Sequence, residues 1–183
     1  LNSIKQYIIA NEQKNAVHYL NKFAKLIRKI LDASRVKVVS LADELETMDL
    51  YMSIENIRFS NEINFEVFVD NDINLDQVKI PSLILQPFLE NALWHGLSSK
   101  KGDIKLGILI RNLNQGHIEI QIEDNGIGRI NAAALKENKI HKKSSYGLRL
   151  TKERLESFYK NYSNKQAIKI VDLMDEKGEA RGT

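Results

Sequence analysis

The 183-residue sequence has no cysteine, only two prolines and a single tryptophan. The lack of cysteine excludes disulfide bonds and thiolate metal sites, and it leaves the redox compartment undetermined. No apolar run approaches the roughly 18 residues that a membrane-spanning helix needs, and the first residues lack the basic and apolar stretches of a signal peptide. The 27 basic and 24 acidic residues nearly balance, so no nucleic-acid partner is expected.

Two amphipathic helices are expected in the first third of the chain. Residues 13–33 contain neither glycine nor proline, and their apolar residues recur every three or four positions, which places them on one helix face. Ser40 is a candidate N-cap for a second helix, with Asp43 and Glu44 in its first turn, where negative charge suits the helix dipole. The resulting hairpin would leave apolar surface uncovered. Pairing with a second copy would close a four-helix bundle, and packing on the following domain is the alternative.

The pattern changes near residue 60, where short strands begin. Alternating apolar residues predict four strands, at 63–69, 104–110, 118–122 and 168–173. The second and third are separated by residues of turn composition and are expected to form a hairpin. The fold class predicted is therefore α+β, with a helical hairpin over residues 1–60 and a mixed domain over residues 61–183.

The remaining segments of this second domain are predicted to be helices and loops. A helix is expected from Ile84 to Leu97, with a kink or a restart at Pro87, and another from Leu148 to Tyr159. Residues 129–146 are polar and rich in lysine, which predicts a long mobile loop that is either functional or disordered. Residues 175–183 are expected to form a polar turn.

The segment after the third predicted strand suits a purine nucleotide. Asp124 ends that strand and is followed by Gly126 and Gly128. An ionised carboxylate only accepts hydrogen bonds, so it can select the exocyclic amine of adenine over the carbonyl of guanine. The glycines allow the backbone to approach a ligand closely. The alternative is an ordinary Asp-Asn-Gly turn.

The predicted helix over residues 84–97 supplies the second part of this candidate site. Asn91 and His95 are four residues apart, so both side chains lie on one helix face, and we count both as candidate cofactor-binding residues. The Asn91 carbonyl oxygen suits Mg²⁺, because phosphate oxygens and water supply its other ligands. An amide or a histidine satisfied within the core is the plainer alternative. The sequence has neither a P-loop nor the protein-kinase signatures, so a nucleotide site must be of another type.

Taken together, these residues resemble the ATP-binding domain of the GHKL superfamily, which includes gyrase, the Hsp90 chaperones, histidine kinases and MutL. Asn91 matches the metal-binding Asn of the N box. Asp124, Gly126 and Gly128 match the Asp-x-Gly-x-Gly box that reads adenine. Ser145-Tyr146-Gly147-Leu148 falls where the second glycine box closes the mobile ATP lid. The order and spacing of the three boxes imply a two-layer α/β sandwich that binds ATP and Mg²⁺.

Within the superfamily the match narrows to the LytS-type sensor histidine kinases. Leu85 to Gly96 resembles their Leu-Gln-Pro-x-x-Glu-Asn-Ala-x-x-His-Gly segment, and the resemblance covers nearly the whole chain. It implies a kinase core that passes the γ-phosphoryl of Mg²⁺–ATP to a histidine and then to an aspartate of a response regulator. In this family the acceptor histidine immediately precedes a Leu-Asn-x-Ile segment, here Leu1 to Ile4. The acceptor is therefore expected upstream of the chain, and we assign no catalytic residue within it.

Three positions depart from the superfamily pattern. Pro87 stands where the ATPases carry a glutamate base, which argues against rapid hydrolysis. Trp94 stands where many of the kinases have lysine, and Ser145 replaces the first glycine of the second glycine box. Two alternatives therefore stay open: a degenerate module that binds nucleotide without phosphotransfer, and a GHKL ATPase of the chaperone or repair type.

The resemblance also implies partners and a location. We expect a homodimer formed through the N-terminal helices, and a response regulator as the protein partner. We expect this chain to be a cytoplasmic piece of a longer protein of the inner membrane, whose anchor lies outside it.

Overall fold

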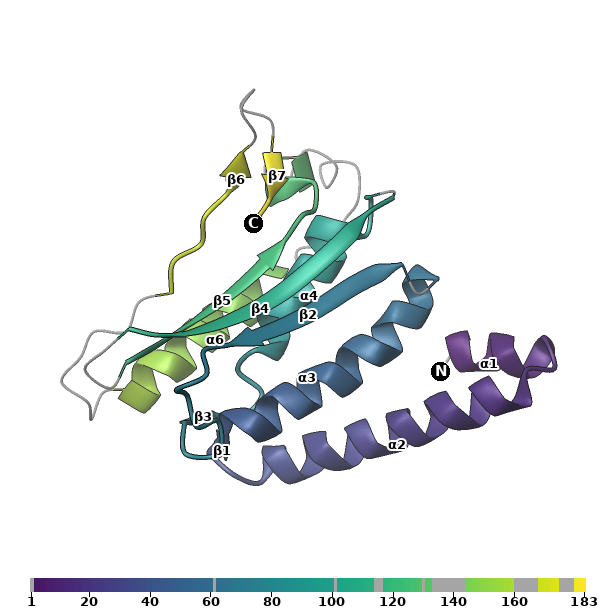
Figure 1. The fold of residues 1–183 in the computed structure, drawn as a ribbon, viewed down its shortest axis with the longest axis horizontal. Helices are drawn as coiled ribbons and strands as arrows, with labels where there is room; N and C mark the ends of the chain where they lie inside the picture. Colours follow the sequence, from purple (N-terminus) through teal and green to yellow (C-terminus); the bar gives the residue numbers. More distant parts are fainter. Residues whose placement is uncertain are drawn as a thin grey trace. The chain divides into compact units, whose positions relative to one another are not determined.

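The computed structural model describes residues 2–60, 62–100, 102–113, 117–129, 131–132, 144–159, 168–174 and 180–183 (Figure 1). The chain forms two compact units, which are Leu1–Glu62 with Asn74–Leu83, and Ile63–Ile73 with Ile84–Thr183. The first unit is mainly helical and the second combines a sheet with helices, so the predicted α+β class is confirmed. Within the part of the chain that the structure describes, no helix is long and apolar enough to span a membrane.

The helices of the first unit include the predicted hairpin. They are α1 (Asn2–Ile9), α2 (Gln13–Ser34), α3 (Leu41–Asn56) and the 3-10 turn η1 (Ile57–Phe59). Left-handed Asn11, with φ of 59°, reverses the chain between α1 and α2, and the rings of Tyr7 and Tyr19 stack 5.4 Å apart. The Lys29 ammonium group pairs with Asp43 and Glu46, which ties α2 to α3.

The start of α3 makes more contacts than the N-cap that the sequence predicted. The Ser40 hydroxyl accepts a hydrogen bond from the Asp43 N–H at 3.1 Å, which confirms the predicted cap. Glu44 is only 1% exposed, and its carboxylate accepts a hydrogen bond from the Leu83 N–H at 2.9 Å. This bond holds the end of the segment 74–83 against α3. Strand β1 (Val38–Ser40) pairs antiparallel with β3 (Lys79–Pro81), a pairing that was not predicted.

The second unit is built on a three-stranded sheet in the order β2-β4-β5. Its strands are β2 (Ile63–Val69), β4 (Ile104–Asn112) and β5 (Ile118–Asp124). The β4–β5 hairpin is antiparallel, as predicted, and β2 runs parallel to β4. Helix α4 (Gln86–Asn91), its continuation η2 (Ala92–Leu97) and α6 (Ser144–Tyr159) lie along one face of the sheet (Figure 1). Alternate residues of β4 are buried on that face: Ile104, Leu106, Ile108 and Ile110.

The helix that carries Asn91 differs from its prediction in two ways. It begins at Gln86 and not at Ile84, and Pro87 lies in the first turn, where a missing N–H costs nothing. Of the two expectations at Pro87, the kink is wrong and the restart comes close, because the helix starts beside this proline. From Ala92 to Leu97 the helix widens into π-helical geometry, which is frequent at functional sites.

The last third of the chain corrects three further predictions. Helix α6 begins at Ser144, four residues before its predicted start at Leu148, and most of the predicted lid over 129–146 lies outside the described residues. The strand predicted from Ile168 is wrong up to residue 172, because β6 comprises only Leu173–Met174. The turn predicted over residues 175–183 contains a strand, β7 (Ala180–Gly182), which pairs antiparallel with β6.

Candidate functional site

The turn after β5 packs directly on the end of the helix that carries Asn91. The Ile127 N–H donates a hydrogen bond to the Gly96 carbonyl oxygen at 3.0 Å. A Cβ atom on Gly126 would lie 2.3 Å from that oxygen, and one on Gly96 would lie 2.5 Å from Oδ1 of Asp124. No side chain fits at either glycine without separating the turn from the helix. The two segments singled out in the sequence are therefore neighbours.

Asp124 lies at the centre of this contact. Its side chain is 5% exposed, and Oδ1 accepts a hydrogen bond from the Gly126 N–H at 2.8 Å. Burial raises the pKa of Asp124 to about 6, although the Gly126 N–H and the positive charge of Lys100 act in the opposite direction. A carboxylate that is desolvated to this extent gains stability from any further N–H donor. Such a carboxylate can accept a hydrogen bond from the amine of a ligand.

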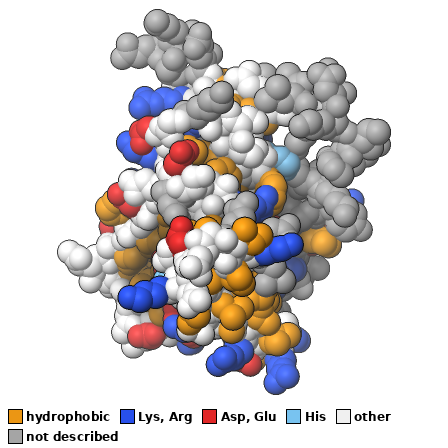
Figure 2. Space-filling view, turned by 90° about the vertical axis from the view of Figure 1, so that its right-hand side faces the viewer, with side chains coloured by type: hydrophobic (Ala, Val, Ile, Leu, Met, Phe, Trp, Pro, Cys, Tyr) orange, Lys and Arg blue, Asp and Glu red, His pale blue; other side chains and the backbone are white. Residues whose placement is uncertain are grey.

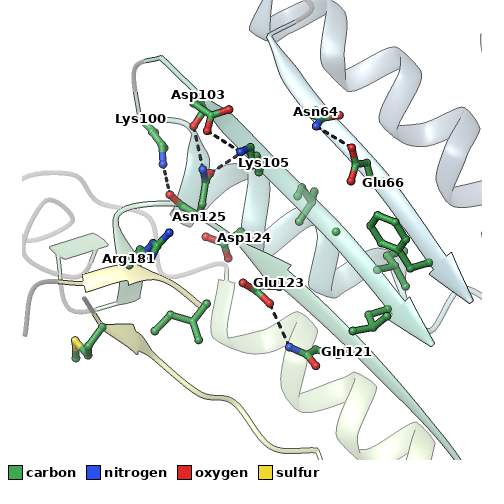
Figure 3. A pocket seen from close by; sticks show the side chains of 17 residues that line it. Asn64, Glu66, Lys100, Asp103, Lys105, Gln121, Glu123, Asp124, Asn125 and Arg181 are labelled. Atoms are coloured by element: carbon green, nitrogen blue, oxygen red, sulfur yellow. Dashed lines mark hydrogen bonds and ion pairs between the residues drawn. The ribbon is translucent and has the colours of Figure 1, made fainter. Parts of the chain in front are cut away.

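Asn125 fastens the turn to the neighbouring strand. Its Oδ1 accepts a hydrogen bond from the Lys105 N–H at 2.8 Å, and its Nδ2 donates to the Asp103 carbonyl at 3.0 Å. The Lys100 ammonium group donates to the Asn125 carbonyl (Figure 3). Sequence reasoning used Asn125 only as a turn residue, because no spacing rule links it to residues 103–105.

The turn is closed from its other side by β7. Gly128 has a φ of 73°, and a Cβ atom there would lie 2.6 Å from the Cβ of Ala180. The Asp124 N–H donates to the Thr183 carbonyl at 3.0 Å. Gly182, with a φ of 132°, passes so close that a Cβ atom would overlap the Asp124 carbonyl. Four glycines of the second unit, Gly96, Gly126, Gly128 and Gly182, thus allow helix, turn and strand to meet around one carboxylate.

Asn91 is held in one orientation by its own helix. Its Nδ2 donates a hydrogen bond to the Pro87 carbonyl at 2.5 Å, which turns Oδ1 away from that carbonyl and leaves it available as an acceptor. His95 is half-buried on η2, and Trp94 is 47% exposed. Among the described residues, no group of three or more His, Asp or Glu side chains could hold a metal ion. The Asn91 side-chain oxygen could serve as a single ligand for a cation that also binds phosphate.

For the predicted second glycine box, residues 145–148, the structure gives only the position of the backbone. Ser145, Tyr146, Gly147 and Leu148 lie in the first turns of α6, which contacts α4. The structure describes their backbone and not their side chains. Their assignment to the site stays a prediction.

A cavity of about 890 Å³ lies on the other face of the sheet. It is lined by polar side chains that alternate with the buried ones along the strands, including Asn64, Glu66, Gln121 and Glu123 (Figure 3). Asp124, Asn125 and Lys100 also line it, whereas Asn91 and His95 do not. The cavity was not predicted, and it shares Asp124 with the predicted nucleotide site.

Comparison with known proteins shows what the chain is similar to. Residues 1–63 match the family model described as Histidine kinase. The sensor histidine kinase BtsS of Escherichia coli K12 is 34% identical over 127 residues, which is 68% of this chain and 21% of that protein. The sensor protein LytS of Oceanobacillus iheyensis is 34% identical over 119 residues, which is 64% of this chain and 20% of that protein. The chain thus spans about a fifth of the length of these two relatives.

One solved structure is also similar. It is the histidine kinase domain of the blue-light activated histidine kinase from Erythrobacter litoralis EL346, with a TM-score of 0.47 and 15% identity. The match covers 75% of this chain and 64% of that one.

Proposed function

Because the chain belongs to the histidine kinases of the LytS type, we propose that it is the kinase core of a two-component sensor kinase. It binds Mg²⁺–ATP and transfers the γ-phosphoryl group to a histidine that precedes residue 1 in the longer protein, and then to an aspartate of a response regulator. The observation that carries the proposal is the contact of Gly96 with Gly126, since it brings the Asp124 turn to the helix of Asn91.

Asp124 is the residue that reads the base. Its buried carboxylate accepts a hydrogen bond from the exocyclic amine of adenine and has no donor to offer the carbonyl of guanine. At Gly126 the turn packs on the Gly96 backbone, which brings Asp124 to the end of the helix that carries Asn91. His95, Gly128 and the second glycine box, residues 145–148, complete the proposed nucleotide contacts.

Asn91 is the proposed metal ligand. The Pro87 carbonyl fixes its amide nitrogen, so the oxygen is presented without a further rearrangement. A bound Mg²⁺ would neutralise phosphate charge, and the Asn91 side-chain oxygen would hold it as a single neutral ligand from the protein. The chain contributes mainly positioning, which is the larger part of catalysis in phosphoryl transfer.

The first unit is the proposed dimerisation element. Four large apolar side chains of α2 are exposed by 39% to 58%: Val17, Leu20, Ile27 and Leu31. With Ala24 they follow alternating spacings of three and four, which is the pattern of a helix that packs against other helices. Apolar side chains also gather in the lower part of the face seen in Figure 2, bordered by Lys and Arg. A second copy would cover the α2 stripe and form a four-helix bundle.

The proposal places the chain in the cytoplasm, where ATP and response regulators are found, as part of a longer protein anchored in the inner membrane. The test is phosphotransfer in a chain extended upstream through the proposed acceptor histidine. With γ-labelled ATP we expect label that is lost in acid and kept in alkali, as for phosphohistidine. Asp124→Ala and Asn91→Asp should each lower labelling at least about tenfold.

Asp103→Asn is the matched control, because Asp103 is an exposed acidic residue near the same turn, and labelling should stay unchanged. Nucleotide binding without label in the extended chain would favour the degenerate module. Steady ATP hydrolysis without label would favour the ATPase type.

A further inference from the structure

Lys100 joins the helix end to the turn that carries Asp124. It lies three residues after η2, and its backbone N–H donates a hydrogen bond to the Leu97 carbonyl at 3.0 Å. Its half-buried side chain crosses to the turn, where the ammonium group donates to the Asn125 carbonyl (Figure 3). Lys100 therefore makes the same connection as the Gly96–Gly126 contact, but through a charged group.

The other charged groups around the turn do not replace Lys100. On β4, Lys105 pairs with Asp103 at 3.0 Å, and its side chain is 59% exposed. On β5, Glu123 adds negative charge, which works against ionisation of Asp124. Among the described residues, Arg181 of β7 and His95 of η2 are further titratable groups on elements that pack on the turn. Arg129, which directly follows the turn, pairs with Asp172 at 2.7 Å. Among these groups, Lys100 is the cation whose charge lowers the pKa of Asp124.

We propose that Lys100 is a positioning and specificity-determining residue for the base-reading carboxylate. Its ammonium group holds the Asn125 carbonyl, and with it the turn, and its positive charge favours the ionised form of Asp124. This inference rests on the proposed nucleotide site.

As a consequence, the preference for ATP over GTP depends on the positive charge of Lys100. An ionised Asp124 only accepts hydrogen bonds and favours the amine of adenine, whereas a protonated carboxyl group can donate to the carbonyl of guanine. Without the positive charge, Asp124 takes up a proton at higher pH. Discrimination between ATP and GTP then weakens near neutral pH and returns when the carboxyl group ionises again.

The test compares affinities for Mg²⁺–ATP and Mg²⁺–GTP at pH 7 and pH 8.5 in the 183-residue chain. The ratio cancels the ionisation of the triphosphate, which both ligands share. In Lys100→Met we expect the ratio to fall about tenfold at pH 7, the value of one hydrogen bond to a charged group, and to recover at pH 8.5. Lys100→Arg should keep the wild-type ratio at both pH values. Lys105→Met, the matched control, should keep it too.

Lys100→Gln separates the charge from the hydrogen bond, because its amide can still donate to the Asn125 carbonyl. We expect this variant to behave as Lys100→Met does. A ratio that is unchanged in both variants, or that is lowered equally at both pH values, would overturn the inference, since a merely structural role predicts no recovery.

A second readout needs no nucleotide. Titration of the Asp124 carboxyl carbon by NMR should show a midpoint at higher pH in Lys100→Gln than in wild type, and an unchanged midpoint in Lys105→Met. An unchanged midpoint in Lys100→Gln would refute the role of Lys100 while leaving the proposed function intact. A wild-type chain that binds neither nucleotide would refute the proposed function and this inference with it.

Discussion

At the scale of single residues, Asp124 is the group on which the account depends. Its carboxyl group has a pKa raised to about 6 by burial, against about 3.9 in an unfolded chain. The folded state therefore binds this proton more tightly than the unfolded state does. The cost of burying the charge is fully present above pH 6 and disappears as the pH falls below about 4.

This linkage predicts a pH-dependent difference between wild type and Asp124→Asn. Between pH 7.5 and pH 4, the wild type should gain up to about 3 kcal/mol in free energy of unfolding relative to the variant. Urea denaturation at several pH values measures the difference. A difference that is constant with pH would show that the Asp124 carboxyl group titrates normally in the folded chain.

Gly96 provides a second prediction at this scale. A Cβ atom there would lie 2.5 Å from the Asp124 carboxylate oxygen, so Gly96→Ala should cost about 1–3 kcal/mol of stability and weaken ATP binding by pushing the turn away. Gly107→Ala is the matched control, because the nearest atom to its Cβ would be 3.9 Å away. Thermal melting and calorimetry measure the two effects. Equal behaviour of the two alanine variants would contradict the close contact of helix and turn.

At the scale of elements, the sequence predicts those parts of the fold in which a pattern repeats. Strand β4 alternates over nine residues, and α2 keeps its apolar period over 22, so both were predicted with nearly correct bounds. Strands β1, β3, β6 and β7 have two or three residues each, too few to show a period. Their positions depend on pairing partners that are distant in sequence, which local patterns do not reveal.

The residues of the candidate site likewise divide into those that the sequence indicates and those that it does not. Asn91, Asp124 and the glycines could be proposed from the sequence because residue type and spacing indicate their chemistry. Lys100 and Asn125 were missed, because their roles arise from contacts across 20 residues or more. The close contacts of Gly96 and Gly182 could not be predicted either. Two backbones that approach closely leave no pattern in the sequence of either segment alone.

Glu44 gives a prediction at the scale of elements, since it connects α3 to the segment 74–83. Glu44→Ala removes the acceptor for the Leu83 N–H and leaves space where a buried side chain was, so we expect a loss of about 1–3 kcal/mol in stability. Glu46→Ala, the control, breaks only exposed ion pairs with Lys25 and Lys29 and should cost at most about 1 kcal/mol. Chemical denaturation compares the two variants. Similar losses would mean that the buried carboxylate does not hold this segment.

At the scale of the whole molecule, the exposed apolar stripe of α2 predicts self-association. Leu20→Glu and Leu31→Glu together place two charges on the stripe and should convert a dimer into a monomer in sedimentation velocity. Asn21→Glu with Arg28→Glu adds exposed charges elsewhere on the same helix and should leave the dimer intact. A wild-type chain that is monomeric at high micromolar concentration would contradict the four-helix bundle.

The central claim is that the second unit selects ATP through Asp124. The most direct measurement is a calorimetric titration of the chain with Mg²⁺–ATP and then with Mg²⁺–GTP, with emission of Trp94, three residues from Asn91, followed in parallel. The account predicts saturable binding of ATP, at least about tenfold weaker binding of GTP, and loss of this preference in Asp124→Ala. Equal binding of both nucleotides, or binding of neither, would contradict it.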